Sequence, residues 1–439
     1  MRRIITILVN AFILFFIFLP LAKSQKVNKD SFVQVKGTQF VLGGKPYYYL
    51  GANFWYGMNL GSNEKGRERL IRELDRLHQL GVNNLRVLAL SEGPDTEPYR
   101  IVPSVQPSAG KFNETLLQGL DFLLSEMSKR KMLAVVCLGD FWHWSGGFGQ
   151  YLIWAGEKGT IPYPPPNPGG SWDTYQKYVA RFYSNRKAVK LYHNAITKII
   201  TRRNTVTNVN YREDPTIMSW QLGNEPRGLN NEKDFNLWID NTAQLIKNLD
   251  PHHLVNVGSE GYTPYKDYAG NNFLLNHDGP NIDYTTAHIW VQNWDWYDPK
   301  KHSETFQEAN KKMYDYLVEH EKAAGQLKKP LVIEEFGISR DSGSFISTFS
   351  VKVRDEYYQN VFEAIYKKAK SGSPVVGVNF WAWGGEGRPR VPEEFWKPGD
   401  NFIGDPPHEA QGWYSVYDND STTHQVIKHY TEMLDMLGK

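Results

Sequence analysis

Two glutamates stand at the ends of apolar segments, where carboxyl groups could carry out bond cleavage. Glu225 closes the segment 220–225 (WQLGNE), and Glu335 closes the segment 331–335 (LVIEE). Cleavage of a glycosidic bond needs two carboxyl groups, one to protonate the leaving oxygen and one to attack carbon or to activate water. Either glutamate alone would be explained as well by a structural ion pair. The presence of both glutamates favours a catalytic role.

Short apolar runs that alternate with helical patterns would position these side chains. Leu70, Leu74, Leu77 and Leu80 form one helical stripe. The apolar runs lie at 47–54, 84–90, 132–138, 217–222, 254–257, 284–289, 331–336 and 375–381. Eight such runs predict an α/β fold, a single-domain (β/α)8 TIM barrel with its catalytic groups at the carboxyl ends of the strands. A doubly wound open sheet is the alternative, but no G-x-G-x-x-G follows the first run.

Three further segments refine this prediction. The fifth unit is irregular, because 261–282 holds no convincing helical pattern. The Pro-rich stretch 161–170 is expected to form an exposed loop, and 424–437 is expected to form the closing helix.

The N-terminus has the layout of a signal peptide. Arg2 and Arg3 are basic, 4–21 are almost wholly apolar, and small residues follow at 22 and 24. We therefore expect a signal peptide at 1–24, a catalytic domain at 25–439, and a secreted protein, extracellular or periplasmic, without stable membrane insertion after cleavage. An uncleaved membrane anchor is the alternative. The only cysteine, Cys137, lies in an apolar run and is expected to pack in the core.

The composition of the chain limits the classes of ligand that we expect it to bind. The net charge is +2 with both signs interspersed, so we expect no nucleic-acid partner. Aromatic residues make up 14% of the chain and include 14 tryptophans, many beside Gly, Asn and Asp, which suits sugar ligands. His252 and His253 are adjacent rather than spaced for one helical face, so we expect no metal site and no cofactor. A serine nucleophile elbow is also absent.

The segments around the two glutamates resemble those of a known family. The segments 220–227 (WQLGNEPR) and 333–337 (IEEFG) resemble the acid/base and nucleophile segments of glycoside hydrolase family 5, and most of all those of the endo-β-1,4-mannanases. The resemblance covers essentially the whole mature chain and includes 32–40 (FVQVKGTQF), 85–87 (LRV), 380–383 (FWAW) and 413–418 (WYSVYD). It implies a retaining, monomeric hydrolase that cuts internal β-1,4-mannosidic bonds in mannan, glucomannan or galactomannan.

Carried over by position, the resemblance implies Glu225 as general acid/base, Glu335 as nucleophile and Asn224 as the ligand of the sugar 2-hydroxyl. Alternation of side chains along a strand agrees with Glu335 rather than its neighbour Glu334, since adjacent residues should face opposite sides. Arg86 would keep Glu335 ionised, because a nearby cation lowers a carboxyl pKa.

Five further residues are implied as substrate-binding. His288 matches an active-site histidine of the family. Trp290 stands where many relatives have tyrosine, and its role is open, because an indole donates but cannot accept a hydrogen bond. Trp381 resembles the stacking platform under the sugar, and Trp142 resembles a tryptophan that lines the cleft. Arg227 resembles an arginine that reaches the sugar beyond the cut, although a solvated loop arginine is an equal alternative.

Two other functions remain open from the residues alone. An endo-β-1,4-glucanase on the same fold would use the same glutamate pair. A glycan-binding barrel without turnover is the alternative from outside the enzymes. The presence of Glu225 and Glu335 together with Arg86, Asn224 and His288 argues against such a loss of activity.

Overall fold

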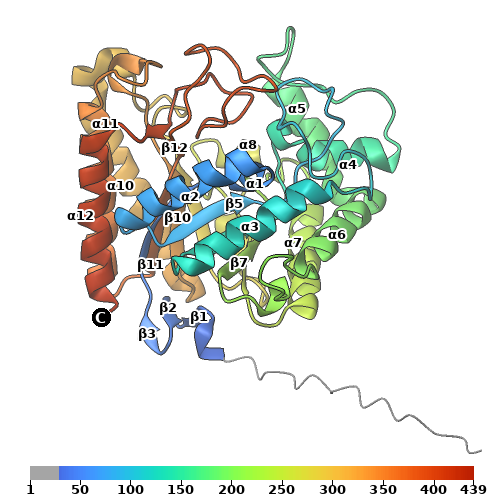
Figure 1. Ribbon diagram of the computed structural model, residues 1–439, viewed down its shortest axis with the longest axis horizontal. Helices are drawn as coiled ribbons and strands as arrows, with labels where there is room; N and C mark the ends of the chain where they lie inside the picture. The colour runs from blue at the N-terminus through green and yellow to red at the C-terminus, as the bar shows by residue number, and fades with distance from the viewer. Residues whose placement is uncertain (1–28) are drawn as a thin grey trace, which may run out of the picture.

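The computed structural model describes residues 29–439, so the predicted signal peptide, 1–24, lies outside the described residues. Eight parallel strands form its centre in the order β8-β7-β6-β5-β4-β11-β10-β9 (Figure 1). Their bounds are β4 (Tyr49–Asn53), β5 (Asn84–Leu88), β6 (Leu133–Cys137), β7 (Ile217–Gln221), β8 (Leu254–Asn256), β9 (Thr285–Ile289), β10 (Leu331–Phe336) and β11 (Val375–Phe380). Each predicted apolar run contains one strand, which confirms the TIM barrel.

The gap between the two terminal strands of this order is bridged by other hydrogen bonds. The backbone N–H of Asp283 donates to the carbonyl of Val255 at 2.8 Å, and that of His288 donates to Glu260 at 3.0 Å. The sheet is therefore nearly closed.

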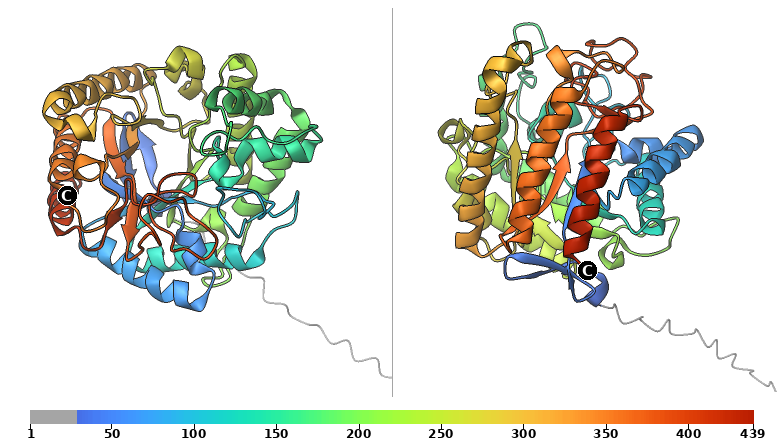
Figure 2. Two further views of the ribbon diagram at one scale, coloured as in Figure 1. Left: turned by 90° about the horizontal axis from the view of Figure 1, so that it is seen from above. Right: turned by 90° about the vertical axis from the view of Figure 1, so that its left-hand side faces the viewer.

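Helices surround the sheet (Figure 2). Their bounds are α1 (Gly57–Gly61), α2 (Glu64–Gln79), α3 (Glu114–Lys129), α4 (Gly147–Ala155), α5 (Trp172–Val179), α6 (Arg186–Ile200), α7 (Glu232–Leu249), α8 (Lys266–Ala269), α9 (Phe273–His277), α10 (His302–Leu327), α11 (Lys352–Lys370) and α12 (Ser421–Leu437). The leucine stripe of α2 faces the core, and Asn63 caps that helix by accepting from the N–H of Gly66. The irregular fifth unit holds only the short α8 and α9, and α12 is the predicted closing helix.

A small antiparallel sheet closes the amino-terminal end of the barrel (Figure 1). It consists of β1 (Gln34–Lys36), β2 (Gln39–Leu42) and β3 (Lys45–Pro46). Phe40 is fully buried and meets Tyr284 edge-to-face, with 5.2 Å between the ring centroids. Packed side chains therefore fill the amino-terminal end of the barrel.

The carboxyl ends are partly covered by the segment 386–415, drawn as red loops in Figures 1 and 2. It joins β12 (Trp383–Gly385) to β13 (Val416–Tyr417). Cys137 is buried at the end of β6, as predicted. Within residues 29–439, no helix combines the length and the apolar character needed to cross a bilayer.

Candidate active site

A cavity of about 890 Å³ opens at the carboxyl ends of the barrel strands. Most of the predicted site residues line it, namely Trp142, Asn224, Glu225, Arg227, Trp290, Glu335 and Trp381. Arg86 and His288 do not line the cavity but contact its two glutamates. The predicted residues therefore come together in one place, although they lie on six different strand ends and loops.

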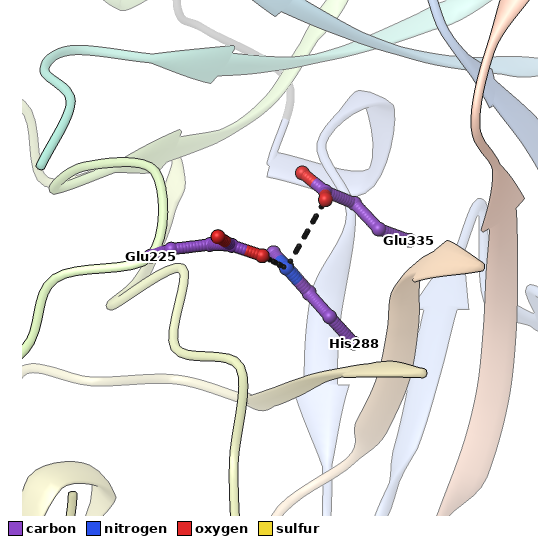
Figure 3. A group of neighbouring side chains, drawn as sticks. All are labelled: Glu225, His288 and Glu335. Carbon is purple, nitrogen blue, oxygen red and sulfur yellow. Dashed lines mark hydrogen bonds and ion pairs between the residues drawn. The ribbon is translucent and has the colours of Figure 1, made fainter. Parts of the chain in front are cut away.

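His288 lies between the two glutamates (Figure 3). Its Nδ1 is 2.6 Å from Oε1 of Glu225 and 3.3 Å from Oε2 of Glu335. One carboxylate oxygen of each glutamate and one ring nitrogen of the histidine all lie within 4.8 Å of one another. Burial lowers the pKa of His288, but the charge of Glu335 and hydrogen bonds to the carboxylates outweigh burial and raise this pKa well above its usual value. The ring is therefore held in its protonated form.

Arg86, in the middle of β5, binds the nucleophile candidate Glu335. Its guanidinium donates from Nη1 to Oε1 of Glu335, and from Nη2 to Oδ1 of Asn224 at 2.7 Å. Nε of Arg86 also donates to Oε1 of Gln221 at 2.9 Å, and Nη1 donates to Oδ1 of Asn53 at 3.1 Å. Arg86 is buried and stays charged, so it places a positive charge against the carboxyl group of Glu335.

Glu334 also points into the barrel, so the expectation from strict alternation was wrong. Its Oε2 accepts from Nε2 of Gln221 and lies 3.8 Å from Nε of Arg86 and 4.0 Å from Nε2 of His288. The pairing of β10 with β9 shifts register between Ile333 and Glu335, which breaks the alternation. Glu335 lines the cavity, whereas Glu334 is fully buried.

Glu225 has a strained backbone and two indole donors. Its φ of 49° lies in the left-handed region that residues other than glycine rarely adopt. Trp142 donates from Nε1 to Oε2 of Glu225 at 2.6 Å, and Trp290 donates from Nε1 to Oε1 at 3.3 Å. The sequence left the role of Trp290 open. In the structure its indole contacts the acid/base candidate, Glu225.

Arg227 is fixed rather than solvated. It makes two parallel hydrogen bonds to Glu260, at 2.6 and 2.7 Å, and a third to Gln176 at 2.8 Å. Its guanidinium carbon lies 4.8 Å from the centre of the Trp142 ring. The side chain is partly buried and paired, which removes the alternative of a freely solvated arginine.

Trp381 follows β11 and presents a large apolar surface to the cavity. It is 5% exposed and meets Trp290 edge-to-face, with 6.0 Å between the ring centroids. Its buried Nε1 has no hydrogen-bond partner among the described residues. These features fit a surface on which a sugar could stack.

Other polar residues belong to the site and were not identified from the sequence. Glu260, His408 and Glu409 line the cavity, and Asp140 contacts two residues that line it. Burial, together with the charges of Asp405, Glu335 and Glu225, raises the pKa of Glu409 well above its usual value. His408 and Glu409 come from the segment 386–415, whose sequence shows no strand or helix pattern that would place it over the barrel.

The group Glu225, His288 and Glu335 also has the spacing to hold a metal ion. In the structure, the ring of His288 contacts Glu225 and the guanidinium of Arg86 contacts Glu335.

Comparison with known proteins places this chain among glycoside hydrolases. The family model described as "GH family 5 beta-mannosidase-like" matches residues 30–439. Mannan endo-1,4-beta-mannosidase 4 of Solanum lycopersicum is 31% identical over 373 residues, which cover 82% of this chain and 85% of the relative. Mannan endo-1,4-beta-mannosidase 1 of Arabidopsis thaliana is also 31% identical, with 80% and 82% covered.

Solved structures show the same likeness. The crystal structure of the glycoside hydrolase family 5 mannosidase from Rhizomucor miehei is 42% identical, has a TM-score of 0.86, and covers 94% of this chain and 99% of its own. A mutant of that mannosidase is known in complex with mannosyl-fructose. The endo-1,4-beta-mannanase of the same organism is 20% identical with a TM-score of 0.68 over 92% of this chain and 99% of its own, which shows the common fold.

Proposed function

The chain belongs to the β-mannosidase-like group of glycoside hydrolase family 5 and is a glycoside hydrolase, and on this premise we propose that it cleaves β-1,4-mannosidic bonds with retention of configuration. The observation that carries the proposal is the close approach of Glu225 and Glu335, since one carboxylate oxygen of each lies within 4.8 Å of the other. Retaining enzymes hold their two carboxyl groups about 5–5.5 Å apart, whereas inverting enzymes leave about 6.5–9.5 Å for a water molecule.

The reaction proceeds in two displacements. Glu335 attacks the anomeric carbon while Glu225 protonates the departing glycosidic oxygen, which leaves a covalent glycosyl–enzyme ester. Glu225, now deprotonated, then takes a proton from water, and the water oxygen displaces Glu335 from the anomeric carbon. Arg86 balances the negative charge of Glu335 before attack and after release, and Asn224 binds the 2-hydroxyl of the sugar.

Stereochemistry tests this assignment. Proton NMR of the earliest product should show the β-anomer first, because two inversions restore the original configuration. Initial appearance of the α-anomer would exclude Glu335 as nucleophile.

We propose internal bonds of mannan, glucomannan or galactomannan as the substrate. The plant relatives that match four fifths of this chain are named mannan endo-1,4-beta-mannosidases. The tryptophans that line the cavity, Trp142, Trp290 and Trp381 among them, provide apolar surfaces for successive sugar rings. The alternatives are a glucanase on the same fold and a glycan-binding barrel without turnover.

A second mode of action, removal of single mannose units from chain ends, is favoured by one observation. The segment 386–415 contributes Phe395, His408, Glu409 and Trp413 to the wall of the cavity. The structure that is 42% identical is named a mannosidase rather than a mannanase. A wall across one end of the cleft would limit how many sugars can bind on that side.

Product analysis separates the two modes. Mannohexaose tagged at its reducing end should give tagged products of several lengths from the first minutes if internal bonds are cut. Early release of mannose with tagged mannopentaose as the only tagged product would establish action at chain ends.

We also propose that the protein is secreted, monomeric and built from one catalytic domain after removal of residues 1–24. The support is the sequence layout of the N-terminus together with one barrel that uses the described residues 29–439. Intact-mass analysis of secreted protein should show a chain that begins at residue 25, and light scattering should give the mass of one chain. A membrane-bound protein that keeps residues 1–24 would instead support the uncleaved anchor.

A further inference from the structure

Asp140 is a buried carboxyl group that the proposed reaction does not use. It follows β6 and is 0% exposed. Its Oδ1 accepts from the backbone N–H of Trp142 at 2.9 Å and from Nδ2 of Asn224 at 3.3 Å, and its Oδ2 accepts from the hydroxyl of Ser145 at 3.0 Å. Within residues 29–439 it forms no ion pair with a basic side chain closer than 4 Å. Burying a carboxyl group without a neighbouring cation costs free energy.

Both residues bonded to Oδ1 act on the candidate catalytic groups. Trp142 donates from its indole to Oε2 of Glu225. Asn224 accepts from Arg86, which in turn holds Glu335. One oxygen atom of Asp140 is therefore connected by hydrogen bonds to the acid/base on one side and to the nucleophile on the other.

The bond to Asn224 also fixes the direction of its amide. Oδ1 of Asn224 must face Arg86, which has only donors, and one N–H must face the carboxyl oxygen of Asp140. One N–H of the amide remains for a substrate hydroxyl. Asp140 and Arg86 together hold this N–H in one orientation.

We propose that Asp140 is a positioning residue, which orients Asn224 toward the substrate and seats Trp142 so that its indole donates to Glu225. The inference rests on the proposed function, because it concerns the residues that carry it. The alternative is a purely local role, since a bond from Asp140 to an N–H two residues on is also an ordinary turn motif.

Kinetics with two aryl β-mannosides separate these roles. In Asp140→Ala, loss of the Trp142 contact should impair proton donation by Glu225, so kcat/KM should fall at least ten-fold more for a phenyl than for a 2,4-dinitrophenyl leaving group, which needs no proton. Asp140→Ser, which leaves a polar group in the pocket, should show the same pattern and serves if the alanine variant does not fold. Asp140→Asn keeps the acceptor oxygen and should stay within three-fold of wild type on both substrates.

Two controls complete the test. Ser145→Ala removes the third hydrogen bond to the same carboxyl group and should leave both values of kcat/KM within two-fold of wild type. In the Trp142→Phe background, Asp140→Ala should change the ratio of the kcat/KM values for the two substrates by less than three-fold, because the indole donor is already absent. The proposal would be overturned if Asp140→Ala or Asp140→Ser folds with a lowered Tm but keeps the wild-type ratio of kcat/KM values for the two substrates. Persistent turnover in Glu335→Ala would instead refute the proposed function.

Discussion

Nδ1 of His288 lies 2.6 Å from Oε1 of Glu225, and both side chains are buried. A protonated histidine next to a carboxylate has the same net charge as a neutral histidine next to a carboxylic acid. Because the pKa of His288 is raised well above its usual value, the pair keeps its proton through neutral pH.

Folding stability should depend on pH through His288. Its pKa is raised in the folded state, so its stabilisation is complete below the unfolded value of about 6.5 and is lost as pH rises through the folded value. The free energy of unfolding of wild type relative to His288→Gln should thus shrink as pH rises above about 6.5, as measured by urea denaturation. His193→Gln is the control, because burial lowers the pKa of folded His193 to about 4, so the corresponding difference for His193→Gln should not shrink as pH rises. A constant difference for His288→Gln would contradict the proton assignment.

The two glutamates should respond differently to truncation. Glu335→Ala should abolish turnover, and azide should restore a glycosyl azide of inverted configuration by occupying the vacated position. Glu225→Ala should lower kcat/KM by about 10²–10⁴-fold for substrates with poor leaving groups and spare those with very good ones, with azide giving a product of retained configuration. Chromatography and NMR of the azide products provide the measurement. Exchanged outcomes would mean that the two roles are reversed.

Arg86 should not be replaceable by lysine. Its planar fork contacts Glu335, Asn224 and Gln221 at once, and one ammonium group cannot reproduce that geometry. We expect Arg86→Lys to lower kcat on mannan at least ten-fold. Arg202→Lys is the matched control, since Arg202 is equally buried and pairs with Asp121 far along the chain from the site. A lower Tm with unchanged kcat in both variants would mean that Arg86 serves only as a structural ion-pair partner.

The strand positions and the location of the two candidate glutamates were predictable because they depend on local patterns. Buried parallel strands show as short apolar runs, and barrel strands carry functional groups at their carboxyl ends, which places Glu225 and Glu335 together. Arg86 and His288 followed from the same rule combined with the family resemblance.

The residues that the sequence did not reveal depend on register and on long-range loop placement. The inward position of Glu334 results from a register shift against β9, which the local alternation of β10 does not encode. His408 and Glu409 reach the cavity through an irregular segment whose path is set by tertiary contacts, such as the bond from the Trp55 indole to the carbonyl of Gly404 at 2.8 Å. Asp140 has no distinguishing motif, and only its hydrogen bonds show what it contacts.

Substrate choice should depend on the group that faces the 2-hydroxyl. Mannose differs from glucose only in the axial orientation of this hydroxyl, and Asn224 presents a fixed N–H because its oxygen is occupied by Arg86. A site arranged to bind one hydroxyl rejects a misplaced counterpart, since a buried polar group is then left unpaired. We expect soluble mannan or glucomannan to be cut at least ten times faster than carboxymethyl cellulose, and Asn224→Ala to narrow this ratio, as measured by release of reducing ends. Faster cleavage of carboxymethyl cellulose than of mannan by the wild-type protein would favour the alternative that it is a glucanase. Binding of mannan without cleavage by the folded protein would favour the alternative of a glycan-binding barrel without turnover.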